Sequence, residues 1–159
     1  MAMHTWFECK IRYEKTMENG MNKKVTEPYL VDALSFTEAE ARIIEEMTPF
    51  ITGEFTVSDI KRANYSELFP SDEESADRWF KCKLIFITLD EKSGAEKKTS
   101  TQVLVQAADL RDAVKKLDEG MKGTMADYQI GMVSETPLMD VYPYSAEPND
   151  KPEFDPSKA

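Results

Sequence analysis

Two segments of the sequence combine a tryptophan with several basic residues in a similar spacing. Alternate residues of an expected strand share one face, so an indole and its neighbouring cations would project from that face together. The residues concerned are Trp6, Lys10, Arg12, Lys23 and Lys24 in the first segment, and Trp79, Lys81, Lys83, Lys97 and Lys98 in the second. An open face of this kind could stack single-stranded bases or bind an anionic ligand.

The same pattern is also typical of tryptophans that pack inside the protein. A tryptophan on the sheet face away from a helix can be buried where two halves meet, with lysine stems lying over its ring. Ile85 and Ile87 share the face of Trp79, which favours burial of both faces of that strand. We therefore interpret the tryptophans first as packing residues and keep ligand binding as the alternative.

The two cysteines, Cys9 and Cys82, occupy matching positions in the two segments. Each lies on the face of its expected strand that carries large apolar residues, which is typical of a small buried side chain. No CxxC spacing, nearby histidine or basic cluster on that face would lower the pKa of either thiol. We expect both cysteines to be packing residues and not nucleophiles or disulfide partners.

Other residue types that commonly carry catalysis are scarce. The sequence has one histidine, His4, so a histidine-dependent triad or a multi-histidine metal site cannot form within one chain. Neither of the common glycine-rich phosphate loops occurs. The acidic residues follow no calcium-loop pattern, and no spacing shows a catalytic carboxylate pair. We therefore expect no enzyme activity, no catalytic residue, no metal ion and no cofactor.

The charge balance limits the partners that the protein can bind. Its 20 lysines and arginines and 30 acidic residues give a formal net charge of −10, so its field repels phosphate backbones and anionic lipids. Nucleic acid is disfavoured as a partner but not excluded. The longest apolar run, residues 84–87, is far shorter than the roughly 20 residues that cross a bilayer. Because no secretory signal is visible either, we expect a cytoplasmic protein without membrane contact.

The two segments belong to a longer internal repeat. WFECKI at residues 6–11 recurs as WFKCKL at 79–84, YLVDA at 29–33 recurs as VLVQA at 103–107, and ELFP at 67–70 recurs as DVYP at 140–143. The offset between copies is 73 or 74 residues in every block. Three blocks in one order at nearly one separation predict a tandem duplication.

Each copy predicts four strands and one helix in the order ββαββ. In the first copy, apolar alternation and short apolar runs predict strands at residues 7–13, 29–33, 55–60 and 68–69. Ser35, three residues before Glu38, forms a capping box at the start of a helix of about three turns. Asp109 is the corresponding cap in the second copy, where glycines end the helix.

These elements predict an α+β fold with a tandem duplication of a ββαββ unit. We expect two mainly antiparallel sheets, each with one helix, packed with pseudo-two-fold symmetry. Residues 4–70 form the first repeat, the acidic residues 71–78 a linker, and residues 79–144 the second repeat. Residues 145–159, which are rich in proline and acidic residues, are expected to form a disordered tail.

The order of these blocks resembles an uncharacterised domain family found mainly in Bacteroidetes and in associated phages or mobile elements. The resemblance covers residues 4–144 and rests on WFECKI, YLVDALSFTEAEARI, FTVSDIKRANYSELF, RWFKCKL, VLVQAADLRDA and SETPLMDVYPY. It implies an intracellular bacterial or phage-associated context. Because the family has no established activity, the resemblance implies no catalytic or binding residue.

We therefore expect a non-enzymatic binding or scaffolding module that engages a protein partner in the bacterial or phage-infected cytoplasm. The partner would be reached through exposed sheet edges or the acidic surface, and a second copy of the chain is one such partner. The alternative is a single-stranded nucleic-acid or anionic-ligand binder that uses the repeated Trp/Lys face. A third hypothesis is an enzyme with unpatterned carboxylates between the halves.

Overall fold

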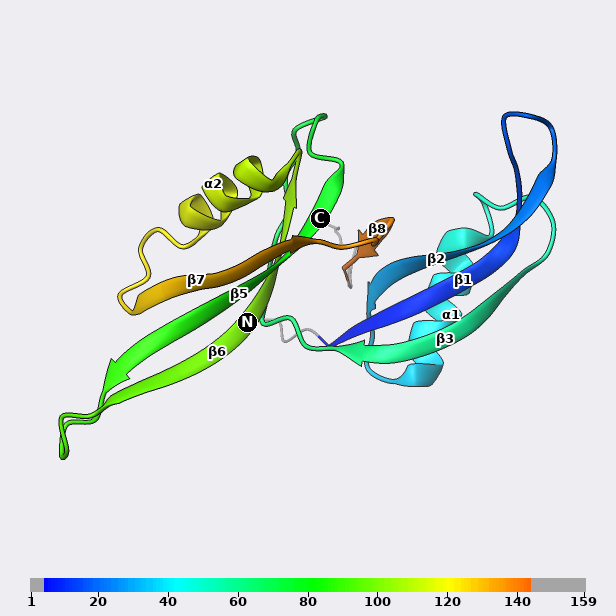
Figure 1. The fold of residues 1–159 in the computed structure, drawn as a ribbon. Coiled ribbons are helices and arrows are strands. Elements are labelled where there is room, and N and C mark those ends of the chain that lie inside the picture. Colours follow the sequence, from blue (N-terminus) through cyan, green and yellow to red (C-terminus); the bar gives the residue numbers. More distant parts are fainter. Residues whose placement is uncertain (1–4, 144–159) are drawn as a thin grey trace, which may run out of the picture. The chain divides into compact units, whose positions relative to one another are not determined.

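A computed structural model describes residues 5–143 of the chain. Within this range the protein is a mixed α+β structure with two helices and two four-stranded sheets (Figure 1). The elements are β1 (Trp6–Thr16), β2 (Asn22–Asp32), α1 (Phe36–Met47), β3 (Phe55–Ala63), β4 (Glu67–Phe69), β5 (Arg78–Leu89), β6 (Glu96–Ala107), α2 (Leu110–Gly120), β7 (Asp127–Glu135) and β8 (Asp140–Tyr142). Among the described residues, unit 1 consists of 5–63 and 139–143, and unit 2 of 64–138.

Unit 1 is a sheet of order β3-β1-β2-β8 with α1 against one face. β1 is antiparallel to both β2 and β3, whereas β8 runs parallel to β2 beside residues 29–31. The turn between β1 and β2 contains Gly20 with a φ of 81°, a conformation that glycine adopts without strain. The core between sheet and helix contains Phe7, Cys9, Ile11, Val31, Ala33, Ala39, Ile43 and Met47.

Unit 2 is a sheet of order β4-β6-β5-β7 with α2 against one face. β5 is antiparallel to β6 and β7, and β4 runs parallel to β6 beside residues 103–105. Its core contains Phe80, Cys82, Leu84, Val103, Val105, Ala107, Ala113, Leu117 and Met121. In both units, alternate residues of the central strands enter the core, as the period-two pattern predicts.

Both helices begin at the caps predicted from the sequence. The backbone N–H of Glu38 donates to Ser35 Oγ at 3.1 Å, and the Glu38 carboxylate accepts from the N–H of Leu34 at 2.7 Å. In α2, the N–H of Asp112 donates to Asp109 Oδ1 at 2.8 Å. Such reciprocal caps satisfy backbone donors that have no partner within the helix.

The fourth strands do not pair within the sequence repeats to which they were assigned. β4 comes from the predicted repeat 4–70 but joins the sheet of unit 2, and β8 comes from the predicted repeat 79–144 but joins unit 1. β3 lies at one edge of the unit 1 sheet, and the place beside β2 that β8 occupies lies at the other edge, three strand spacings or about 14 Å away. Residues 64–66 alone connect β3 to β4, and fully extended they reach only about 14 Å. A connection of this length cannot cross the sheet and also turn back along it.

Besides its pairing with β2, side-chain contacts hold β8 in unit 1. The ring of Tyr142 stacks on Tyr29 with 6.2 Å between the centroids, and Arg42 Nη2 donates to the carbonyl of Pro143 at 3.3 Å. Residues 71–78, predicted to form an acidic linker, include the buried Ala76, and Arg78 is the first residue of β5. The duplication itself and the pseudo-two-fold packing stay predictions, and the tail at 145–159 lies outside the described residues.

Candidate functional site

Both tryptophans of the repeated pattern are buried. Trp6 is 2% exposed and Trp79 is 5% exposed, and each lies on the sheet face away from the helix of its own unit. An indole at this level of burial offers no free ring face to a base. The burial of both indoles therefore argues against base stacking on their rings.

The basic residues of the pattern lie on both faces of the sheets. Strand register places Lys10, Arg12 and Lys24 on the same face as Trp6, and Lys81, Lys83 and Lys98 on the same face as Trp79. Lys23 lies opposite Lys15 and Lys97 lies opposite Thr88, so both project from the helix-bearing faces. The ten residues therefore do not form one continuous basic surface in either unit.

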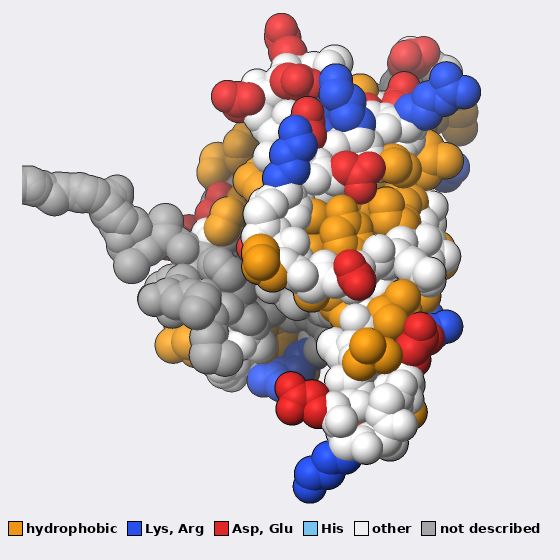
Figure 2. Space-filling view, turned by 90° about the vertical axis from the view of Figure 1, so that its left-hand side faces the viewer, with side chains coloured by type: hydrophobic (Ala, Val, Ile, Leu, Met, Phe, Trp, Pro, Cys, Tyr) orange, Lys and Arg blue, Asp and Glu red, His pale blue; other side chains and the backbone are white. Residues whose placement is uncertain are grey.

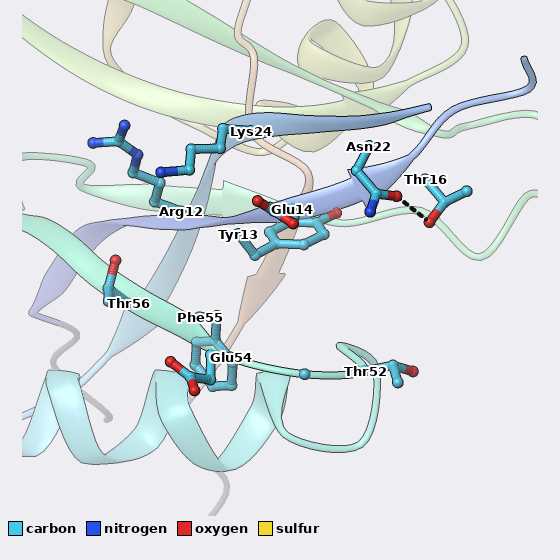
Figure 3. Close-up of a pocket in the computed structure, with 11 residues that line it drawn as sticks. Arg12, Tyr13, Glu14, Thr16, Asn22, Lys24, Thr52, Glu54, Phe55 and Thr56 are labelled. Carbon is cyan, nitrogen blue, oxygen red and sulfur yellow. Dashed lines mark hydrogen bonds between the residues drawn. The ribbon is translucent and has the colours of Figure 1, made fainter. Parts of the chain in front are cut away.

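A surface pocket of about 750 Å³ lies at the outer end of the unit 1 sheet, the end at which β1 and β2 are joined by their hairpin turn. It forms where β1 continues past the first residue of β3, so that Glu14–Thr16 have no β3 partner. Arg12 and Lys24 line one end of the pocket, and the aromatic residues Tyr13 and Phe55 line another part of it (Figure 3). Sequence analysis had singled out only the two cations.

The two cations of this pocket have no ion-pair partner among residues 5–143. Lys24 lies directly opposite Glu14 in the strand register, but no ion pair forms between them. Figure 3 shows the charged ends of Arg12 and Lys24 at the same end of the pocket. Two positive charges side by side without a counter-ion repel each other, so this end of the pocket attracts anions.

On the helix-bearing face of the same sheet, Glu27 gathers three partners. Glu27 Oε1 accepts from the hydroxyl of Tyr13 at 2.8 Å and from that of Tyr29 at 3.4 Å, and Lys15 Nζ lies 3.7 Å from Glu27 Oε2. Burial, followed by the hydrogen bond to Glu27, raises the pKa of Tyr13 to about 12. Burial also raises the pKa of Tyr29, and it raises that of Tyr142 to about 12.

This tyrosine cluster was not predicted from the sequence. Tyr13 and Tyr29 were interpreted only as apolar positions of two strands, because alternation does not distinguish a tyrosine with a bonded hydroxyl from a phenylalanine. The signal that could have found it is the strand register. If the hairpin turn at Gly20 fixes that register, Tyr13 lies two residue pairs from Glu27, so the two side chains are diagonal neighbours on the same face. The hydrogen bonds of Glu27 to the two tyrosines connect β1 and β2, so the cluster stabilises the sheet.

A second surface pocket, of about 760 Å³, lies between β4 and the end of α2 in unit 2. Its cation, Lys116, is already neutralised. Lys116 Nζ lies 2.8 Å from Glu73 Oε1, 2.9 Å from Asp112 Oδ2 and 3.1 Å from Ser71 Oγ. These bonds connect α2 to the segment after β4, so we assign Lys116 a structural role.

The cysteines are both free and buried, as the sequence predicts. Burial, reinforced by the nearby charge of Glu8, raises the pKa of the Cys9 thiol to about 12. Burial alone raises that of Cys82 to about 11. A thiol that stays protonated and covered is a poor nucleophile.

Two long strands expose an outer edge, and they differ in charge. β3 forms one edge of the unit 1 sheet and carries Asp59, Lys61 and Arg62. β7 forms one edge of the unit 2 sheet, and its residues 128–134, YQIGMVS, have no charge. Met132 in this stretch is 41% exposed. On the surface shown in Figure 2, hydrophobic side chains gather in the middle, and charged ones lie mainly above and below them.

The described part of the chain shows no feature of a metal centre or of a membrane-spanning helix. Within residues 5–143, no three His, Cys, Asp or Glu side chains come together in a way that could hold a metal ion. Neither α1 nor α2 has the length and apolar character needed to cross a bilayer.

Comparison with known proteins gives one match. A family model described as a domain of unknown function (DUF4494) matches residues 5–144. No curated protein and no solved structure matches the chain.

Proposed function

We propose that this chain, which belongs to the DUF4494 family, is a non-enzymatic protein-binding module. The description of the family assigns no function, so the proposal is inferred from the surface of the chain. Its partner adds an extended segment to the free outer edge of β7. The observation that carries this proposal is the uncharged edge at residues 128–134. The taxonomic range implied by the sequence resemblance, Bacteroidetes and their phages, remains part of this proposal, as does a cytoplasmic location.

An edge strand exposes backbone N–H and C=O groups that can pair with another strand. Proteins usually protect such edges with charged residues, proline or very short strands. β3 follows this rule, because it carries three charged residues near its end. β7 does not, because its nine residues have charges only at Asp127 and Glu135. A long, uncharged and unprotected edge is the kind of surface that strand addition uses.

The composition of β7 also indicates the chemistry of the partner. Ile130 and Tyr128 are half-buried on the helix-bearing face, and Met132 and Gln129 are exposed on the other. An added strand would therefore meet apolar or neutral side chains on both faces. We expect an extended partner segment of low charge with β-branched or aromatic residues, and a second copy of β7 meets this description.

The test compares partner capture by the full chain and by two matched lysine variants. Gln129→Lys places a charge in the middle of β7, and Ser58→Lys adds the same charge to an exposed position of β3. We expect Gln129→Lys to lose the captured protein and Ser58→Lys to retain it. Hydrogen exchange of the complex should then show protection at residues 127–135. Equal capture by both variants, or protection elsewhere, would contradict the proposal.

The finer description of the fold is part of the same proposal. We infer that the chain arose by tandem duplication of a ββαββ unit and that the units pack with pseudo-two-fold symmetry. The support is that each sheet has the same order of repeat-equivalent strands, β3-β1-β2-β8 in one and β7-β5-β6-β4 in the other. The repeated blocks of sequence support the same inference.

The hypothesis of a base-stacking ligand on the Trp/Lys face is weaker. Its central residues, Trp6 and Trp79, are 2% and 5% exposed, so stacking on their rings has no support. The net charge of −10 also disfavours a long polyanion. Two of its basic residues, Arg12 and Lys24, line the same pocket, and they favour a small anionic ligand.

A further inference from the structure

We propose that the pocket at the outer end of the unit 1 sheet binds a phosphate monoester, whose phosphoryl group lies between Arg12 and Lys24. This site is independent of the strand-addition edge, which lies in unit 2. Neither cation has an ion-pair partner among the described residues, and both line the same pocket. Lys15, only three residues from Arg12, is by contrast 3.7 Å from Glu27.

The strand register gathers hydrogen-bond donors around Arg12. Arg12 pairs with Thr26 on β2 and with Thr56 on β3, so the three side chains form a row across the sheet on one face. Lys24, two residues before Thr26, projects from the same face. Figure 3 shows Thr56 below the Arg12 side chain, within the same pocket. The guanidinium of Arg12, the ammonium group of Lys24 and the hydroxyl of Thr56 all line the pocket, and together they match the several oxygens of a phosphoryl group.

The charges of the pocket favour one doubly charged group. A phosphate monoester carries about −1.5 to −2 at pH 7 and so neutralises two cations, whereas a carboxylate or a phosphodiester carries about −1. Glu14 and Glu54 line the rest of the pocket and would repel a second anionic group. This arrangement accepts a single terminal phosphoryl group and disfavours a phosphodiester chain.

The remainder of the pocket has room for the organic part of the ligand. Its volume of about 750 Å³ exceeds that of a phosphoryl group alone, and pockets of roughly 300–1,000 Å³ hold small organic molecules. Tyr13 and Phe55 contribute aromatic surface to the wall. We therefore expect a monoester with an apolar or aromatic group to bind more tightly than the same organic group with a carboxylate.

The experiment is an amide NMR titration of the full chain with phenyl phosphate and, in parallel, with benzoate. We expect saturable shifts at residues 12, 24, 26 and 56 with phenyl phosphate, and binding of benzoate weaker by about tenfold or more. Arg12→Gln and Lys24→Gln should each weaken phenyl phosphate binding by about tenfold. The matched control is Lys23→Gln, which makes the same charge change at the adjacent residue on the opposite face.

Three results would overturn the proposal. Shifts that rise without saturation, or that spread evenly over the lysines, would show general ionic attraction. A loss of affinity in Lys23→Gln equal to that in Lys24→Gln would remove the role of the pocket. Equal affinity for benzoate and phenyl phosphate would remove the preference for a dianion. All substituted residues are exposed on strands, and circular dichroism checks that each variant keeps its fold.

Discussion

The ring of Phe69 lies directly against the backbone of Gly120, the last residue of α2. A β-carbon at position 120 would come within 2.9 Å of two atoms of the Phe69 ring, closer than non-bonded carbon atoms approach each other. Phe69 belongs to β4, which was predicted as part of the first sequence repeat but lies in unit 2. The contact therefore packs β4 against α2, the helix of unit 2.

We expect Gly120→Ala to destabilise the protein because the added methyl group forces the Phe69 ring to move. The expected loss is about 1 kcal/mol in the free energy of unfolding, since overpacking outweighs the better helix propensity of alanine. Urea unfolding of the two single variants and the double variant measures the coupling. In the Phe69→Ala background, Gly120→Ala should be neutral or stabilising. The same loss in both backgrounds would show that the ring is not the cause.

The hydrogen bond from Tyr13 to Glu27 should contribute measurably to stability. Tyr13→Phe removes a 2.8 Å bond to a carboxylate, and we expect it to lower the free energy of unfolding by about 1 kcal/mol. Tyr128→Phe is the matched control, because its hydroxyl makes a longer, exposed bond of 3.3 Å to Asp118. Its effect should be clearly smaller. Thermal or urea unfolding at pH 7 compares the two variants.

The same tyrosine predicts a loss of stability at high pH. Burial and the bond to Glu27 raise the pKa of Tyr13 from 10.0 to about 12 in the folded protein. The folded state therefore favours the protonated phenol, so this contribution is complete below pH 10 and is lost as the pH rises from 10 to 12. Absorbance at 295 nm should show a tyrosine that ionises near pH 12 in the wild type. Ionisation of every tyrosine near pH 10 in the folded protein would contradict this.

Neither cysteine should react with a thiol reagent while the protein is folded. The pKa of Cys9 is about 12 and that of Cys82 about 11, so at pH 8 less than roughly one thiol in a thousand is ionised at either position. Both side chains are also fully buried. Labelling with a disulfide reagent should be slow and should follow the rate of unfolding. Rapid labelling without denaturant would contradict the assignment of these cysteines to the core.

Local patterns in the sequence were sufficient for the order of the elements and for the caps, although β2 begins at Asn22, seven residues before the predicted strand at 29–33. The alternation around Phe7 placed β1, and Ser35 and Asp109 marked the first residues before α1 and α2. They were sufficient because each signal lies within the element that it predicts. The burial of Trp6 was one of two open interpretations, because alternation shows which residues share a face but not whether that face is covered.

The assignment of the fourth strands could not be made in this way. Residues 67–69 and 140–142 have nearly the same pattern, one acidic residue followed by two apolar residues, so either could fit beside β2 or β6. A three-residue strand does not encode its partner in its own periodicity. The pairing depends on whether the connection from β3 is long enough to cross the sheet. The width of the sheet can be calculated only when the order of its strands is known. The pocket lined by Arg12 and Lys24 was not predicted from the sequence for a related reason. Thr56 lies beside Arg12 only in the observed register of β3.

The exchange of β4 and β8 gives the sharpest test of the fold. Tyr142→Ala removes the ring that stacks on Tyr29, and Phe69→Ala removes the ring that lies on Gly120. Because β8 belongs to unit 1 and β4 to unit 2, the two variants should loosen different sheets. We expect amide exchange in Tyr142→Ala to accelerate roughly tenfold or more at residues 29–31, with little change at 103–105.

Phe69→Ala should give the opposite result, with acceleration at 103–105 and little change at 29–31. The two variants are matched controls for each other, since each removes an aromatic ring from the last residue of a three-residue parallel strand. Hydrogen exchange followed by mass spectrometry or NMR resolves the two regions. If each fourth strand paired within its own sequence repeat, the pattern would be reversed, because Phe69 would then support β2 and Tyr142 would support β6. The experiment therefore distinguishes exchanged strands from two self-contained repeats.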